Sequence, residues 1–533
     1  MKISEEIIVL YQKIKTIYEQ KQIDSEEEEK IEVNEITGQV SAFYEKLRNS
    51  VDFKEVHLLR RFAIERNLKR RLLLETLKPN IARSLIEDMI RSRYLKNNTV
   101  PDNKVHLLER VIAKYNKLYT ILNNIYHGKE RQNYFNWLVG IEACEIDMLF
   151  NPENIEDSVV EAMYQVTKTR IKFKGAEVDI REKDIQLYIS IHKSLVKSDD
   201  PIISYHLLNL YFPYWHNSDD SLIKMLGSNF PSIYNTIQNH LRHPYQQKLF
   251  NSLKEPVITF KILYELILVK GLELEELLAN PELLEAEAKI LLNNKYKLIR
   301  KKITASSMRA IVYIFLTKVI LAIILEIPYE LYILKGVNYI NLIINIVFPP
   351  ILMFIIALTI IPPSKENTKK ILENLHDLIY NKKEDSILCK LKAKYRSGLG
   401  FKIFYNILYT ALYIFVFGAV IKLLQSLEFN IVSGGLFILF LTAVSFFASR
   451  IRNTAKEYKA VQKKEGPFSF LINFFSLPIV AVGHWLSIKF KKINIFTFIM
   501  DFIIEAPFKM FIAGFEDWLD FMKEKKEDIY RNE

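Results

Sequence analysis

The chain has 533 residues with a formal net charge of +11, and 50% of its residues are hydrophobic and 25% charged, so it is longer than one domain normally is. Only 15 residues are glycine, less than half of the usual ~7%, which speaks against a sheet-rich fold with many tight turns and favours an all-α protein. The two cysteines, Cys144 and Cys389, lie far apart without a CxxC pattern, which speaks against a disulfide framework and a cysteine-based zinc site.

Residues 1–280 are predicted to form a soluble helical domain. Apolar residues recur there at helical spacing, and turn sequences such as NNTVPDN, KSDDP and NSDD separate the helices. Asp199 and Asp200 before Pro201, and the residues from Ser218 to Asp220, have the character of helix N-terminal caps. Only residues 171–181 fit a small β-hairpin. The N-terminal sequence lacks the long apolar core of a signal peptide, so we expect this domain in the cytoplasm.

A dense basic set lies on one predicted helix of this domain. It comprises Arg60, Arg61, Arg66, Lys69, Arg70 and Arg71. Such a set is typical of sites for nucleic acid or anionic lipid. No aromatic or glycine pattern of an RNA-binding module accompanies it, and glutamates lie nearby, so a solvated helix face is the preferred interpretation. Nucleic acid is therefore not expected as a partner.

The histidines give a weak metal signal. His206 and His216 lie in one stretch, and His240 and His243 are spaced i, i+3, which places two ring nitrogens on one helix face. No Asp, Glu or Cys accompanies them at ligand spacing. The sequence also contains no GxSxG, HExxH, GxxxxGK[ST] or DxD cluster. We therefore assign no metal, cofactor or catalytic residue and do not expect an enzyme.

Membrane segments follow the soluble domain. The chain has no helix breaker after Pro281, so residues 281–308 are predicted to form one helix that runs into the bilayer. Residues 309–361 hold two apolar arms of about twenty residues each, the length that a helix needs to cross a ~30 Å hydrocarbon core. The remaining predicted segments are a basic cytoplasmic loop (362–402), a second membrane hairpin (403–449), and amphipathic or interfacial helices on the cytoplasmic side (450–533).

The links between these four spans alternate in charge. Lysine and arginine are abundant before the first span, in residues 362–402 and after the fourth span, whereas Lys335 is the only cation between the first two spans. Because cations are retained on the cytoplasmic side, both termini are predicted to be cytoplasmic, in the cell membrane. Three cations at the first membrane boundary are candidate contacts for anionic lipid head groups: Arg300, Lys301 and Lys302.

The C-terminal region is predicted to lie on the membrane. Residues 467–490 are apolar enough to span it, but crossing would carry Lys489, Lys491 and Lys492 to the wrong face. We therefore expect an interfacial or re-entrant segment and regard these three lysines as further lipid contacts. Residues 494–520 place a narrow polar stripe opposite a broad aromatic face, which is typical of a helix in the interface.

Polar residues inside the first hairpin form a candidate site. Lys318 lies near the middle of the first span, where a charge costs roughly 2.5–3.5 kcal/mol. Pro349 and Pro350 in the second span leave the carbonyls of Asn345 and Ile346 without intrahelical partners. We predict that the lysine donates to these carbonyls and stabilises a kink, the alternative being a transporter-like substrate site.

Two further features of the spans concern packing. Glu326 and Glu330 are expected at the far interface, where they orient the short hairpin loop. The fourth span offers small residues for packing against another helix: Gly434, Gly435, Thr442, Ser445 and Ser449.

The sequence resembles a group of uncharacterised bacterial multi-pass membrane proteins with a large helical N-terminal cytoplasmic domain. The resemblance rests on FYEKLRNSVDFKEVHLLRRFAIER, YIFLTKVILAIILEIPYEL, PPSKENTKKI and FIMDFIIEAPFKMF. It implies location and architecture alone, and no functional residue is carried over from it.

Three classes of function remain. The preferred one is a membrane-anchored scaffold or regulatory protein whose cytoplasmic domain binds a protein partner. The alternative is a small transporter or channel that uses Lys318 and the proline pair. A membrane enzyme ranks last. The oligomeric state stays open.

Overall fold

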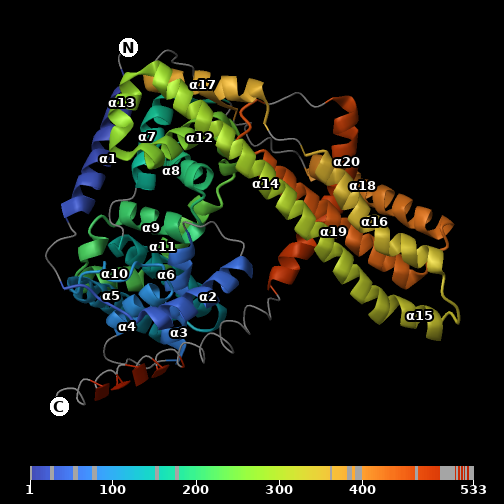
Figure 1. Ribbon diagram of the computed structural model, residues 1–533, viewed down its shortest axis with the longest axis horizontal. Helices are drawn as coiled ribbons and strands as arrows, with labels where there is room; N and C mark the ends of the chain where they lie inside the picture. The colour runs from blue at the N-terminus through green and yellow to red at the C-terminus, as the bar shows by residue number, and fades with distance from the viewer. Residues whose placement is uncertain are drawn as a thin grey trace.

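The residues that the computed structural model describes are helical apart from two short strands (Figure 1). It describes residues 3–23, 29–51, 58–74, 81–150, 155–174, 179–360, 363–380, 387–390, 399–461 and 466–492, together with single positions between 511 and 526. The predicted interfacial helix 494–520 lies almost wholly outside these residues. An all-α fold with several long apolar helices is confirmed.

The soluble part has two hydrophobic cores, which define two lobes. The distal lobe, at the lower left of Figure 1, is built mainly from α2 (Glu35–Val51), α3 (Leu59–Leu74), α4 (Ile81–Arg91), α5 (Asn103–Ile125), α6 (Gly128–Phe150), α9 (Asp200–Tyr211), η3 (Trp215–Asn217), α10 (Asp220–Ser228) and α11 (Phe230–Leu241). The predicted caps are confirmed, since the Asp199 and Asp219 carboxylates accept from the backbone N–H groups of Ile202 and Leu222.

The basic set on α3 is neutralised inside the distal lobe. Arg61 is 1% exposed and pairs with Glu65 and Asp199. The other members pair with acidic groups as well: Arg60 with Asp147, Arg66 with Glu45, Lys69 with Glu65, and both Arg70 and Arg71 with Asp88. The preferred interpretation of a solvated helix face is therefore wrong. The carboxylates come mostly from other helices, which the spacing along α3 does not reveal.

The proximal lobe lies against the membrane helices. It contains α1 (Glu5–Ile23), α7 (Ile155–Arg170), α8 (Ile180–Ile191), η2 (His192–Val196), α12 (Gln246–Lys270), η4 (Gly271–Glu273), α13 (Leu274–Ala279) and α17 (Lys365–Tyr380). Its core continues into the first turns of the next helix, α14 (Pro281–Leu321), through Leu284, Ala288 and Leu292. The domain boundary predicted at residue 280 would therefore cut through one packed core.

The predicted long helix is confirmed. α14 is continuous over 41 residues, and Asn280 caps its start by accepting from the N–H groups of Glu282 and Leu283. Figure 1 shows it running from the proximal lobe along the whole length of the membrane part.

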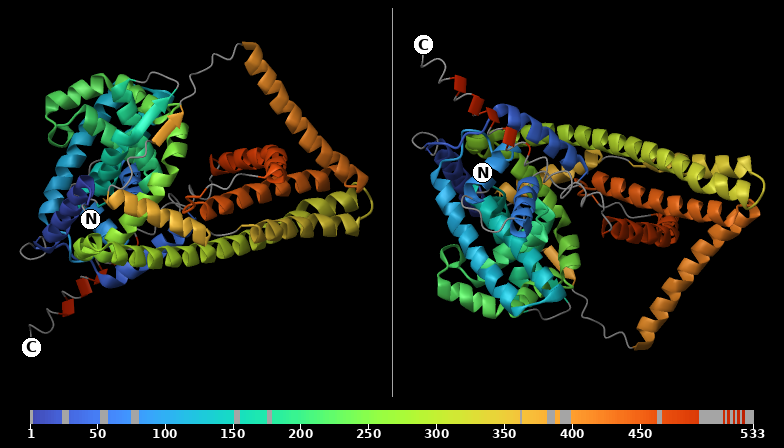
Figure 2. Two further views of the ribbon diagram at one scale, coloured as in Figure 1. Left: turned by 90° about the horizontal axis from the view of Figure 1, so that it is seen from above. Right: turned by 90° about the horizontal axis from the view of Figure 1, so that it is seen from below.

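Among the described residues, five helical segments are long and apolar enough to cross a membrane. They are α14 with η5 (Ala322–Glu326) and α15 (Ile327–Tyr332), then α16 (Tyr339–Leu358), α18 (Leu399–Ser426), α19 (Ile431–Ala455) and α20 (Pro467–Lys492). In Figure 2, α14, α16 and α19 lie alongside one another and α18 leans away from them. α20 runs across this group in Figure 1 and contacts α19.

Three segments beyond α14 return to the soluble part. β2 (Ile387–Lys390) pairs in parallel with β1 (Ile171–Lys174), so the hairpin expected at 171–181 is wrong, because the partner strand comes from beyond the second apolar helix. α17, inside the expected loop, packs on α12 and α14. After α19, Glu457 pairs with Lys261 and Lys197. The ends of α16 and α19 therefore lie on the same side of the membrane helices as the soluble part.

Candidate intramembrane polar site

Lys318 is 0% exposed in the fourth-to-last position of α14, surrounded by apolar helices. Its ammonium group lies 3.6 Å from the Glu326 carboxylate, which is also 0% exposed. The face of the Phe440 ring on α19 lies 5.2 Å away and adds a cation–π contact. An ion pair at this depth is costly to desolvate, so it is a default candidate for function.

The π-helical turn η5 brings this pair together. Residues eight apart in a regular helix point roughly 80° away from each other, since each residue advances about 100°. A π turn inserts one residue without that advance. Glu326, at the end of η5, therefore takes the angular position of a residue seven after Lys318, within about 20° of the same face.

Asn345 of α16 joins the pair to a third helix. Its amide nitrogen donates to the Glu326 carboxylate at 2.6 Å and to the backbone carbonyl of Ser433 on α19 at 3.0 Å. Asn345 and Ser433 are both 0% exposed. One buried polar cluster thus connects α14, α16 and α19.

A second polar layer lies toward the hairpin ends. Glu330 is 2% exposed, and it accepts from the Asn430 amide at 2.6 Å and from the backbone N–H of Asn338 at 3.1 Å. The Asn341 amide donates to the carbonyl of Glu428 at 3.0 Å. These bonds join the end of the first hairpin to the end of the second, so Glu330 does more than orient its own loop.

Three polar atoms of the inner cluster have no hydrogen-bond partner among the described residues. They are Lys318 Nζ, Glu326 Oε2 and Asn345 Oδ1. Because a buried polar atom without a partner costs free energy, a group of three is unusual. The cluster has unused capacity to bind a proton, a water molecule or a small polar ligand next to the Glu326 carboxylate.

The predicted partner of Lys318 is therefore wrong. Its ammonium group makes no hydrogen bond to the carbonyls near Pro349 and Pro350, and α16 continues through both prolines. Glu326 was expected at the far interface but lies inside the bundle. Spacing along a regular helix places it on another face, and the sequence carries no signal for the π turn that moves it.

Of the cations predicted to contact lipid head groups, the structure describes the side chains of those on α14. Arg300, Lys301 and Lys302 are exposed on α14, as contact with head groups requires, whereas Lys295 nearby pairs with Glu265 at 2.6 Å. Lys489, Lys491 and Lys492 have side chains outside the described part of the chain.

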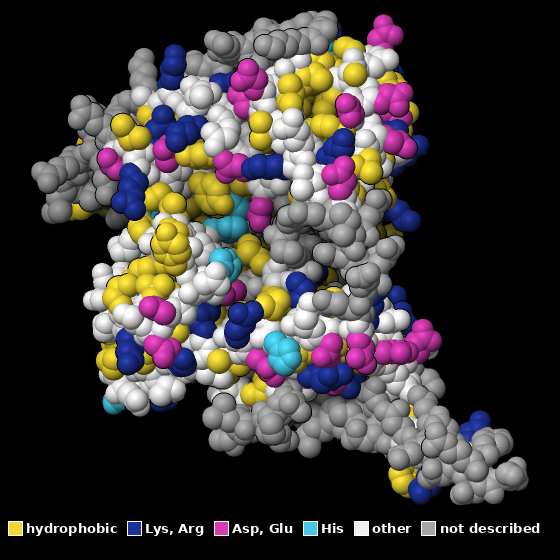
Figure 3. Space-filling model, turned by 90° about the vertical axis from the view of Figure 1, so that its left-hand side faces the viewer, with side chains coloured by type: hydrophobic (Ala, Val, Ile, Leu, Met, Phe, Trp, Pro, Cys, Tyr) yellow, Lys and Arg dark blue, Asp and Glu magenta, His cyan; other side chains and the backbone are white. Residues whose placement is uncertain are grey.

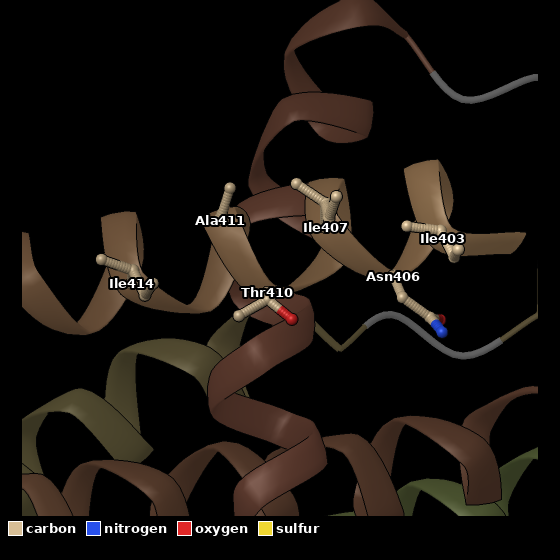
Figure 4. Close-up of a pocket in the computed structure, with 6 residues that line it drawn as sticks. All are labelled: Ile403, Asn406, Ile407, Thr410, Ala411 and Ile414. Atoms are coloured by element: carbon tan, nitrogen blue, oxygen red, sulfur yellow. The ribbon is translucent and has the colours of Figure 1, made fainter. Parts of the chain in front are cut away.

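Two other features lie apart from the intramembrane polar cluster. His240 and His243 both approach Glu182 of α8, with His240 at 3.2 Å, so a carboxylate partner exists that the sequence did not reveal. A shallow hollow of about 470 Å³ lies beside α18 (Figure 4). All six lining residues come from that one helix, and none is titratable: Ile403, Asn406, Ile407, Thr410, Ala411 and Ile414.

No family model matches this sequence, and comparison with curated proteins and with solved structures likewise found no match. The apolar helices and the buried polar side chains between them define a helical membrane protein with a buried intramembrane polar cluster.

Proposed function

We propose that this chain is a membrane-anchored regulatory or scaffold protein, in which a cytoplasmic helical unit that binds a protein partner is coupled to the intramembrane polar cluster. The observation that carries this proposal is the double role of α14. Its first turns complete the proximal-lobe core, and its last turns carry Lys318. A displacement at either end is transmitted along one continuous helix.

In the proposed orientation, the chain crosses the cell membrane four times and both termini lie in the cytoplasm. It is supported by the alternating cation content of the links and by the return of α17, β2 and Glu457 to the soluble part. α20 then lies along the cytoplasmic interface, which agrees with its course across the other helices in Figure 1. Anionic head groups are the proposed partners of Arg300, Lys301 and Lys302.

Hydrogen–deuterium exchange tests the coupling in the full chain reconstituted in nanodiscs. Glu326→Gln keeps the hydrogen bond from Asn345 but removes the charge facing Lys318. We expect faster exchange in α12 and α17 of the proximal lobe as well as in α14. Asn406→Ala, on lipid-facing α18, is the matched control and should leave α12 and α17 unchanged. Changes confined to the membrane helices would remove the basis for a regulatory role.

A second candidate is a small transporter or channel. It is favoured by the three polar atoms of the inner cluster that make no hydrogen bond among the described residues. In proteoliposomes with a trapped pH-sensitive dye, proton flux through the parent and its loss in Glu326→Gln support this candidate. A parent that carries no proton or alkali-metal flux above empty liposomes rules it out, without affecting the exchange test of coupling.

A further inference from the structure

Two histidines and an aspartate meet where the two soluble lobes join. Asp157 is on α7 and His192 begins η2, both in or beside the proximal lobe, whereas His206 is on α9 of the distal lobe. One ligand-type atom from each residue lies within 4.8 Å of the others. Figure 3, which views the molecule from the left-hand side of Figure 1, shows several histidine side chains at the surface among hydrophobic and charged ones.

One nitrogen of each histidine ring makes no hydrogen bond within the described residues. His192 is 1% exposed, yet its Nε2 has no hydrogen-bond partner among the described residues, and the same holds for His206 Nε2. The two rings are tilted by 39° to each other with centroids 4.8 Å apart, and His206 Nε2 lies 3.8 Å from the Asp157 carboxylate. A buried imidazole nitrogen without a partner is costly unless something binds it.

The other ring nitrogen of His192 is held in place. Its Nδ1 lies 3.2 Å from the Ser198 hydroxyl, and the Tyr188 ring packs on it with centroids 4.4 Å apart. Metal-binding histidines commonly have their second nitrogen fixed in this way, which orients the first. η2 is a π-helical turn, and such turns recur at functional sites.

The three side chains are of the kinds that bind a metal ion. Neutral imidazoles with a carboxylate are ligands that Zn²⁺ and similar divalent ions accept.

We propose that Asp157, His192 and His206 form a binding site for one divalent transition-metal ion that connects the two lobes. A tetrahedral Zn²⁺ site places its ligand atoms about 3.4 Å apart, so the side chains close by up to about 1.4 Å when the ion binds. The Asp157 side chain is 40% exposed, which gives the ion a path from solvent and leaves coordination positions for water. Binding joins α7 and η2 to α9.

The full chain, solubilised in detergent and freed of metal with a chelator, is titrated with Zn²⁺ to test the site. We expect one equivalent of Zn²⁺ to bind and to raise the unfolding temperature, and Co²⁺ to give visible absorption bands of a low-coordinate site. Asp157→Asn and His206→Gln should each weaken binding at least about tenfold. His243→Gln, which changes a histidine next to Glu182, is the matched control and should bind as the parent does.

His192 is buried, so its substitution risks misfolding, whereas Asp157 is partly exposed and Asp157→Asn keeps the side-chain shape. The proposal would be overturned if the parent bound no more Zn²⁺ than the double variant with both Asp157→Asn and His206→Gln. Equal loss of binding in His243→Gln would overturn it too, because the ion would then be at Glu182.

Discussion

The Lys318–Glu326 pair allows a quantitative test of the intramembrane site. Replacing Lys318 with Met removes the ammonium group and leaves the Glu326 carboxylate buried with only its bond from Asn345. Glu326→Gln keeps that bond but leaves the ammonium group without an opposite charge. Each change strands one buried charge, and we expect each to lower the free energy of unfolding of the membrane helices by about 2.5 kcal/mol.

The double variant Lys318→Met/Glu326→Gln strands no charge. Methionine fills most of the space of the lysine stem, so we expect the double variant to lose about 2 kcal/mol of the free energy of unfolding. Adding the two single losses would give ~5 kcal/mol. The difference is a coupling of about 3 kcal/mol between the two residues. Combining Lys318→Met with Pro350→Leu should be additive, because the lysine does not bond the carbonyls near the prolines.

The assay follows the membrane helices alone. Met353 on α16 is 0% exposed, so a cysteine at this position reacts with a thiol reagent only when the membrane helices separate. In a chain whose two native cysteines are replaced by serine, the rate at which Met353→Cys is modified at increasing SDS concentration therefore measures the opening of these helices. Thr317→Val is the control, since that hydroxyl bonds to its own helix at the Tyr313 carbonyl at 2.7 Å. Additive losses for Lys318 and Glu326 would refute the argument that the two charges stabilise each other.

Three further predictions test topology, packing and pH dependence. Cysteines at positions 335 and 428, both at hairpin ends with left-handed backbone, should react with an impermeant reagent on whole cells, and those at 382 and 456 should not; labelling at 382 contradicts four spans. Gly483→Val should separate α20 from α19, because an added Cβ would lie too close to the Thr442 carbonyl oxygen and 2.9 Å from Phe446 Cβ. Cross-linking between the two helices should therefore fall. Gly435 has open space around it, so Gly435→Ala should leave this cross-linking unchanged. Burial raises the pKa of Glu142 to about 8, so the folded chain holds a proton there that the unfolded chain releases above about pH 4.5, and stability from this group is lost as pH rises toward 8. Glu142→Gln keeps an acceptor for the Tyr119 hydroxyl and has no proton to lose. The unfolding temperature of this variant should therefore rise relative to that of the parent as the pH is raised from 5 to 8. A difference between the two unfolding temperatures that does not change with pH contradicts this.

The membrane character and the helices follow from the sequence because they depend on local patterns. An uninterrupted run of helix-forming residues after Pro281 is enough to predict α14, and the Asp199 and Asp219 carboxylates are enough to place the starts of α9 and α10. Hydropathy over about twenty residues likewise identifies the apolar helices. These features are set by neighbours within a few turns of the chain.

Tertiary structure decided which polar groups meet. The basic set on α3 finds its carboxylates mostly on other helices, and β1 pairs with a strand more than two hundred residues away. Glu326 reaches Lys318 because a π turn changes the face on which it lies, and His192 meets Asp157 and His206 because two lobes pack together. Helical periodicity describes one helix at a time, so it predicts the face of a residue but not the residue that it contacts on another helix.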